Sequence, residues 1–129
     1  MPDVTVSVSL HGPLLSGTAA AALTEIAHNA INELVDEGEK RVALQLYPGH
    51  GLRSGHYRRS IHGDMLSSLH GRVHDSGVVY GPWLEGVSTR NQRSRFKGYA
   101  MFRNAYQQLE RIKVAVVEKH VQRFMQRMR

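Results

Sequence analysis

Apolar side chains recur every three or four residues over almost the whole last quarter of the chain, from about Tyr99 onward. That spacing puts one apolar stripe along an amphipathic helix. A helix of roughly thirty residues is about 45 Å long, so the rest of the chain must provide a layer of similar length that covers the stripe. The stripe comprises Phe102, Ala105, Tyr106, Leu109, Ile112, Val116, Val117, Val121, Phe124 and Met128.

A second stripe with the same spacing follows Thr18, whose hydroxyl suits the N-cap of a helix. It predicts another long helix, which ends before the glycines of "YPGHGLRSG". Two helices of this length bury their stripes against each other or against a sheet. The second stripe comprises Leu23, Ile26, Ala27, Ala30, Ile31, Leu34, Val35, Val42 and Leu46.

Strands are predicted in the two remaining parts of the chain. Apolar and polar residues alternate over residues 4–10 and 69–74, the period of a strand with one buried face. "SIHGDML" is the expected partner of the second strand, and the β-forming run at 78–84 is expected to be a further strand. The predicted fold is α+β, an antiparallel sheet of about four strands packed against two long helices, in a single domain of residues 1–129.

Charge is distributed unevenly along the sequence. The 17 Lys and Arg and the 11 Asp and Glu residues give a net charge of +6. Residues 1–52 contain two cations and six acids, a net charge of −4, whereas residues 53–129 contain fifteen cations and five acids, a net charge of +10. The second part is therefore expected to contact phosphates or an acidic protein.

The basic character is most concentrated in "TRNQRSRFKGYAMFRNA", because no acid occurs between Glu85 and Glu110. Residues 90–97 are predicted to form an exposed loop, since Asn, Ser and Gly are frequent there. Arginine suits phosphate contacts that carry no sequence information. A contact with protein and a merely solubilising loop are equally compatible with the pattern. The cations are Arg90, Arg93, Arg95, Lys97 and Arg103.

No membrane role is expected. Tyr99, Phe102 and Tyr106 continue the stripe of the last helix, so they are predicted to pack in the core and not to stack on bases. A last helix lying on a membrane would leave the sheet uncovered. The start of the sequence does not match a signal peptide, and the absence of cysteine is compatible with synthesis in a reducing cytoplasm.

The sequence contains no recognisable motif for catalysis, a cofactor or a metal. The glycines of Gly49–Gly55 lack the spacing of a dinucleotide fingerprint and the lysine of a Walker loop. His70 and His74 are expected to share the polar face of a strand with Arg72, whose charge discourages a divalent metal. No local pattern pairs a nucleophile with a base and an acid. We therefore expect no enzyme activity, no cofactor and no metal site.

Three short motifs lie in order across residues 52–105: "LRSGHYRRSI", "VVYGPWLEG" and "FKGYAMFRNA". They resemble, in turn, the "TG-x-L-x-x-SI" signature, the "YA-x-x-x-E-x-G" strand and the "PFLRPA" helix start of the neck and tail-completion proteins of long-tailed bacteriophages, the group with minor tail protein Z-like chains. Tyr80 and Glu85 stand in the matching places of the second motif. Gly86 comes one residue early, and an arginine-rich segment replaces the proline-rich approach to the helix.

The resemblance implies a structural virion protein of the head-to-tail junction: a neck, tail-completion or tail-terminator subunit, made in the cytoplasm of the host bacterium. It would assemble as a ring of about six copies around the DNA channel. Its partners would be further copies of itself, other neck and tail proteins, and genomic DNA in the lumen, contacted without sequence preference. The alternative function is a separate nucleic-acid-binding domain that uses the Arg90–Arg103 surface.

A ring interface joins two different patches of the same protein. We expect acids of the first helix and cations of the basic part to supply these patches, namely Glu33, Asp36, Glu37, Arg58 and Arg59. The five cations of the basic segment, Arg90, Arg93, Arg95, Lys97 and Arg103, are expected to face the DNA channel or a partner ring.

Overall fold

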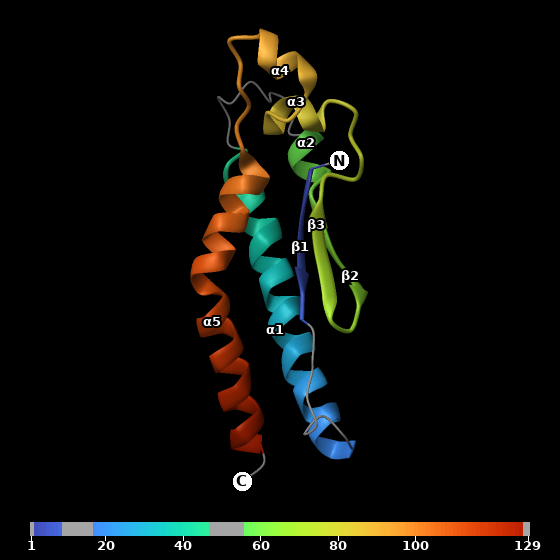
Figure 1. Ribbon diagram of the computed structural model, residues 1–129, viewed down its shortest axis with the longest axis vertical. Helices are drawn as coiled ribbons and strands as arrows, with labels where there is room; N and C mark the ends of the chain where they lie inside the picture. The colour runs from blue at the N-terminus through green and yellow to red at the C-terminus, as the bar shows by residue number, and fades with distance from the viewer. Residues whose placement is uncertain (1, 9–16, 47–55, 128–129) are drawn as a thin grey trace.

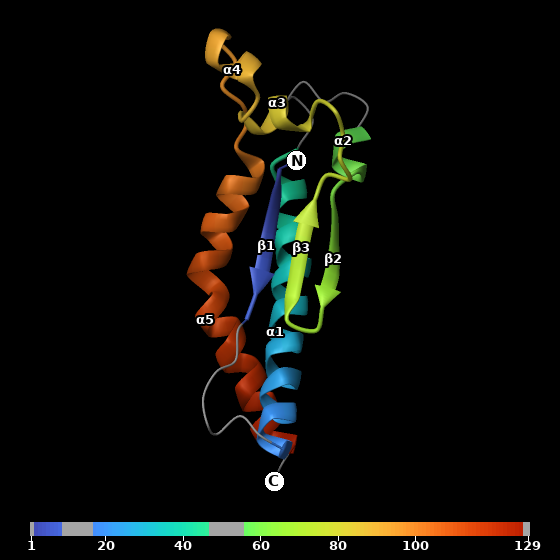
Figure 2. The same ribbon diagram turned by 45° about the vertical axis from the view of Figure 1, so that its right-hand side comes forward.

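The computed structural model describes residues 2–8, 17–46 and 56–127, with the side chains of 17–19 outside that description. Two long helices lie side by side along the molecule, a small sheet covers one of them, and the short helices gather at one end (Figures 1 and 2). The elements are β1 (Asp3–Ser7), α1 (Gly17–Leu44), α2 (His56–Arg59), β2 (His62–Ser67), β3 (His70–His74), α3 (Gly81–Glu85), α4 (Thr89–Arg93) and α5 (Met101–Arg127).

The sheet has three antiparallel strands in the order β1-β3-β2. The predicted α+β class and the antiparallel pairing are confirmed, but the predicted count of about four strands is wrong for the described residues. The run at 78–84 forms a turn and α3 instead of a strand. Pro82 occupies the first turn of α3, a place where its missing N–H costs nothing. A proline is rarely accepted inside a paired strand.

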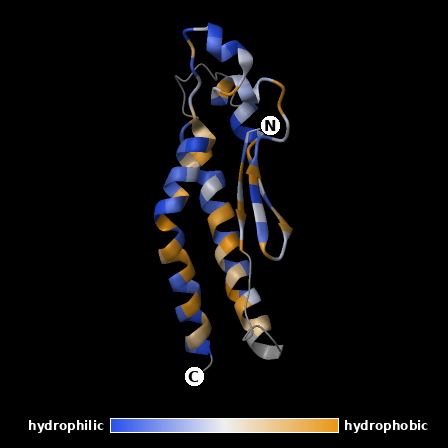
Figure 3. Ribbon diagram, in the orientation of Figure 1, coloured by the Kyte–Doolittle hydropathy of each residue, from blue (hydrophilic) through white to orange (hydrophobic). Residues whose placement is uncertain are grey.

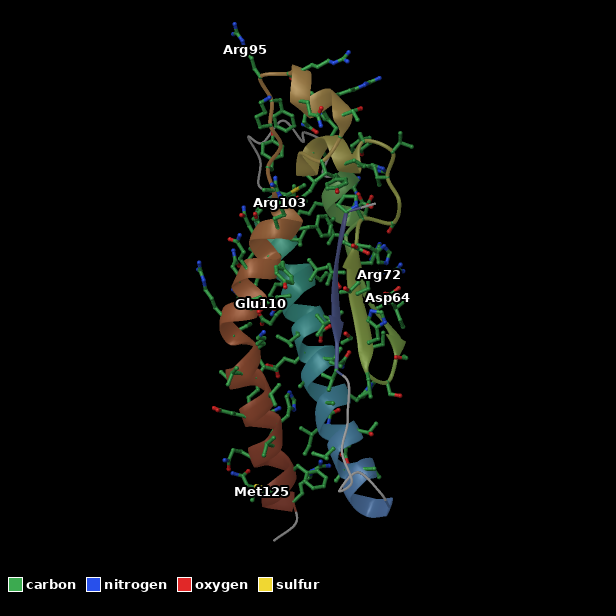
Figure 4. All side chains as sticks on the ribbon, viewed as in Figure 1. Asp64, Arg72, Arg95, Arg103, Glu110 and Met125 are labelled. Carbon is green, nitrogen blue, oxygen red and sulfur yellow. The ribbon has the colours of Figure 1, made fainter. Side chains whose placement is uncertain are left out.

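The sheet packs directly on α1 through its small residues. A Cβ atom added to Gly71 of β3 would lie 2.4 Å from the side chain of Val35 on α1, so only glycine permits this close approach. Gly71 and Val73 are buried, while His70, Arg72 and His74 are partly exposed on the other face, as the alternation predicts. On that face Arg72 donates to the carboxylate of Asp64 at 3.4 Å (Figure 4).

The two predicted stripes meet between α1 and α5 and form most of the core. Figure 3 shows hydrophobic and hydrophilic residues alternating in bands along both helices. Tyr106 and Val117 were predicted to be core residues but are 50% and 40% exposed, because α5 extends sideways beyond the edge of the three-stranded sheet. The buried members of the two helices are Ala27, Ala30, Ile31, Leu34, Val35, Val42, Met101, Phe102, Ala105, Leu109 and Val116.

No helix in the described part of the chain combines the length and the apolar character that crossing a bilayer requires. The glycine-rich segment Gly49–Gly55 lies outside the described residues, so the prediction made for it stays a prediction. The prediction that Thr18 is the N-cap is wrong, because α1 begins at Gly17 and the backbone of Thr18 is already helical.

Candidate interaction site at the arginine-rich end

The candidate site is the end of the molecule formed by residues 81–99, which we call the tip. It contains α3, α4 and the segment that leads into α5, and it projects beyond the end of the sheet and of α1 (Figure 1). Four of the five cations predicted for DNA or partner contact belong to the tip, and Arg103 follows in the first turn of α5.

The predicted loop at 90–97 is partly helical, and this corrects the sequence interpretation. Ser88 is the N-cap of α4: its hydroxyl accepts from the amide of Arg90 at 3.3 Å, and its own amide donates to the side chain of Asn91 at 3.0 Å. These bonds form a capping box that fixes the first turn of the helix. Asparagine in place of the usual Glu or Gln made the signal easy to miss in the sequence.

Asn91 also holds the tip together from inside. Its side chain is 3% exposed and its amide nitrogen donates to the carbonyls of Trp83 and Phe96, both at 3.1 Å. Phe96 in turn lies between Trp83 and Tyr99, with ring centroids 5.1 and 5.0 Å away. Lys97 donates to the carbonyl of Asn91 at 3.0 Å. The ammonium of Lys97 therefore has a structural partner at the end of α4.

Glu85 joins the tip to the start of α5. Its carboxylate is buried and accepts from the amides of Phe102 at 2.7 Å and Arg103 at 3.0 Å. The first amides of a helix lack partners within the helix, and an anion there is favoured by the helix dipole. Burial raises the pKa of the Glu85 carboxyl, and the two amide donors oppose part of that rise. The guanidinium of Arg103 donates to the Glu85 carbonyl at 3.1 Å.

The three remaining cations, Arg90, Arg93 and Arg95, present their guanidinium groups to solvent. All three residues are exposed, and no acceptor among the described residues pairs with their side chains. Arg95 points away from the molecule at its far end (Figure 4). The structure therefore divides the predicted set: Lys97 and Arg103 hold the tip together, while the other three are available to a partner.

An apolar surface groove lies beside Arg90. A groove of about 390 Å³ is lined by Tyr80, Pro82, Trp83 and Arg90, and Val79 on its rim is 95% exposed. Arginine beside exposed aromatic and aliphatic surface is a composition common in protein interfaces. The tip thus offers both charge and apolar surface.

No family model, curated protein or solved structure matches this chain. The features that bear on function are the geometry of the tip and the three motifs. Of these motifs, "VVYGPWLEG" is a turn and a short helix here, and Glu85 caps α5 from that helix.

In the described part of the chain, no group of three or more His, Asp or Glu residues is arranged to hold a metal ion. One buried polar pair exists near the tip, where the hydroxyl of Tyr57 donates to Asp75 at 2.8 Å. Burial, followed by the hydrogen bond to Asp75, raises the pKa of Tyr57. Both residues are buried, so we expect this hydrogen bond to contribute to the stability of the fold.

The residues predicted for self-assembly lie in two separate places. Arg58 and Arg59 are on α2 near the tip, whereas the three acids lie along the middle of α1 (Figure 1). Glu37 pairs with Arg41 on its own helix at 3.2 Å. Of the three acids predicted for self-assembly, Asp36 is the one that is exposed, whereas Glu33 and Glu37 are partly buried.

Glu33 joins α1 to α5 and makes stability depend on pH. Its carboxylate accepts from Lys119 at 2.5 Å and contacts His120 at 3.1 Å. These partners, Lys119 first, lower the pKa of Glu33 from its ordinary value of 4.5. A lowered pKa stabilises the fold above the ordinary value, and the contribution is lost as the pH falls through the folded-state pKa.

We expect Glu33→Gln to cost about 0.5–1 kcal/mol near neutral pH, the range of a partly exposed ion pair, and less at pH 2.5. Urea unfolding at both pH values measures the difference. Glu118→Gln is the matched control, because Glu118 is an exposed acid on α5 without a partner among the described residues. If the free energy of unfolding changed with pH equally in the two variants, Glu33 would not be the source of the pH dependence.

Proposed function

We propose that this chain is a structural subunit of the head-to-tail junction of a long-tailed bacteriophage, acting as a neck, tail-completion or tail-terminator protein. The observation that carries the proposal is the tip, where three arginines without a partner among the described residues stand on a scaffold that is hydrogen-bonded through Asn91 and Glu85. The resemblance of the three motifs supplies the class of protein. A subunit of this kind works by shape and self-association and has no need of a catalytic centre.

Ring assembly would multiply the charge of the tip. Three cations on one subunit bind phosphates weakly, but copies repeated around an axis would form a continuous basic collar. The collar would face either the DNA in the channel or an acidic neighbouring ring. Contact with DNA would be made through phosphates, independent of base sequence.

The second candidate function is a separate nucleic-acid-binding domain, and the same three arginines favour it. A single copy that neutralises three phosphates should lose affinity with a slope of about −2.7 in log K against log salt. A ring subunit that is held by its protein neighbours would not need to bind DNA as a monomer.

Native mass spectrometry together with DNA titration separates the two functions. If the chain is a ring subunit, the untagged protein should form oligomers of one fixed copy number, either alone or with the neighbouring neck protein. A monomer that binds duplex DNA with the slope given above would favour the second function and count against the ring. Replacing Arg90, Arg93 and Arg95 with Glu should abolish DNA binding if the second function is right. Glu substitutions at Arg111 and Arg123, exposed cations of α5, are the control for a general loss of positive charge.

A further inference from the structure

One edge of the sheet is open. β1 lies at the end of the strand order, so it pairs with β3 on one side only. The amide of Val8 donates to Leu69 at 2.9 Å, just beyond the end of the ladder. Residues of an antiparallel strand point alternately to the two sides, so the backbone groups of Thr5 and Ser7 point away from β3. No described residue pairs with these groups, which are the kind that bind another strand.

Three neighbouring pockets, which share lining residues, form a groove along this open edge, between β1 and α5. Its three sections follow the strand from Pro2 to Val8 and have volumes of about 550, 240 and 310 Å³. The last section is lined almost wholly by apolar side chains. These are Val6, Val8, Ala30, Ile31, Leu34, Val114 and Val117. Such a floor suits apolar side chains that stand on alternate residues of an added strand.

The layers of the fold leave room for one more strand. Strands lie about 4.8 Å apart and packed helices about 8–10 Å apart, so two helices side by side cover about four strands. Here α1 packs on all three strands, whereas the main contact of α5 with the sheet is with β1. In Figure 2, β1 is the strand that faces α5. The face of α5 beyond β1 is accordingly uncovered, with Val114 61% and Tyr106 50% exposed.

We propose that an extended segment of another protein adds to the open edge of β1 as a fourth strand and lies on α5. Its backbone pairs with Thr5 and Ser7, and its apolar residues face the groove. The segment is uncharged where it crosses the middle of the groove, because the two charges there, Glu110 and Lys113, already pair with each other at 2.6 Å. A negative charge on the segment is disfavoured at the last section, because the exposed Glu118 borders that section. This inference depends on the sheet edge and not on the arginines of the tip.

The occupant is a single free segment and not the sheet of a second copy. A second copy whose sheet continued this one with its helices on the same face would place those helices in the space that α5 already fills. A strand of five residues is about 17 Å long and buries far less than the roughly 1,200 Å² of a stable interface. The segment therefore belongs to a partner that other contacts hold in place, or it binds weakly when free.

The probe for this site is the acetylated and amidated peptide TVSVTVS, which is uncharged and alternates apolar with polar residues. We expect it to slow amide hydrogen exchange at Thr5 and Ser7 of the full chain at least tenfold at millimolar concentration. The amides of Val4 and Val6, which point to β3, should change less. Absence of protection at the two edge amides would overturn the proposal.

Two substitutions, Thr5→Pro and Val117→Glu, and one control, Thr5→Val, locate the effect. Thr5→Pro removes only an N–H on the open side, which an edge strand tolerates, and should weaken peptide binding at least tenfold. Thr5→Val keeps the N–H and should bind within about twofold of the unmodified chain. Val117→Glu places a charge on the groove floor without touching β1, so it tests the site even if Thr5→Pro unfolds. Unchanged binding in Val117→Glu would contradict a strand lying on α5.

Discussion

Glutamate at positions 90, 93 and 95 is expected to block the joining of heads to tails while the subunit stays folded. The triple variant R90E/R93E/R95E changes the charge of each tip by six units, and a ring repeats that change around its axis. Because all three side chains are exposed and partnerless among the described residues, the free energy of unfolding should change by no more than about 0.5 kcal/mol for each substitution. The expected loss of infectious particles is at least a thousandfold.

Complementation measures this loss: a virus without the gene is supplied with the variant, and heads, tails and complete particles are counted by electron microscopy. Separate full heads and full-length tails are the expected products. The control R111E/R123E alters two exposed cations of α5 and should restore normal titres. Normal titres from the triple variant would exclude the tip from joining, whatever the oligomeric state.

The helices were the part of the fold most accessible to sequence reasoning. An apolar stripe sustained over seven turns has few interpretations, so α1 and α5 followed from residues such as Ile31 and Leu109. The short elements depended on contacts from distant residues. Val78 and Tyr80 favour strands by local preference, but Pro82 and the left-handed Gly86, with φ of 100°, turn the segment into α3.

The candidate site was predicted in composition but not in arrangement. Charge density alone selected five cations, and it could not separate Arg95 from Lys97. That separation arises because Lys97 reaches back to the end of α4 and Arg103 to the carbonyl of Glu85. The cap of α5 was missed for a similar reason. The carboxylate that caps α5 belongs to Glu85, which is far from the helix start in the sequence. The usual capping pattern pairs residues only three positions apart, so it does not detect this cap.

Gly81→Ala is expected to be the most destabilising single substitution near the tip, with a loss of about 3–5 kcal/mol. An added Cβ would lie 1.9 Å from Oδ2 of Asp75, the oxygen that accepts the hydroxyl of Tyr57. Asp75 is 0% and Tyr57 1% exposed, so neither side chain can move into solvent. Overpacking costs about 1–3 kcal/mol, and a broken buried hydrogen bond adds about 1–3 kcal/mol.

Urea unfolding of four variants tests the cause as well as the size of this loss. Val79→Ala is the control for a change of side-chain size nearby; Val79 is 95% exposed, so the free energy of unfolding should change by no more than about 0.5 kcal/mol. Asp75→Ala removes the carboxylate that the new Cβ meets. If the collision is the cause, adding Gly81→Ala to Asp75→Ala costs less than about 1 kcal/mol more, a strong departure from additivity. Additive losses would mean that Gly81 is required for its backbone conformation and not for the space beside Asp75.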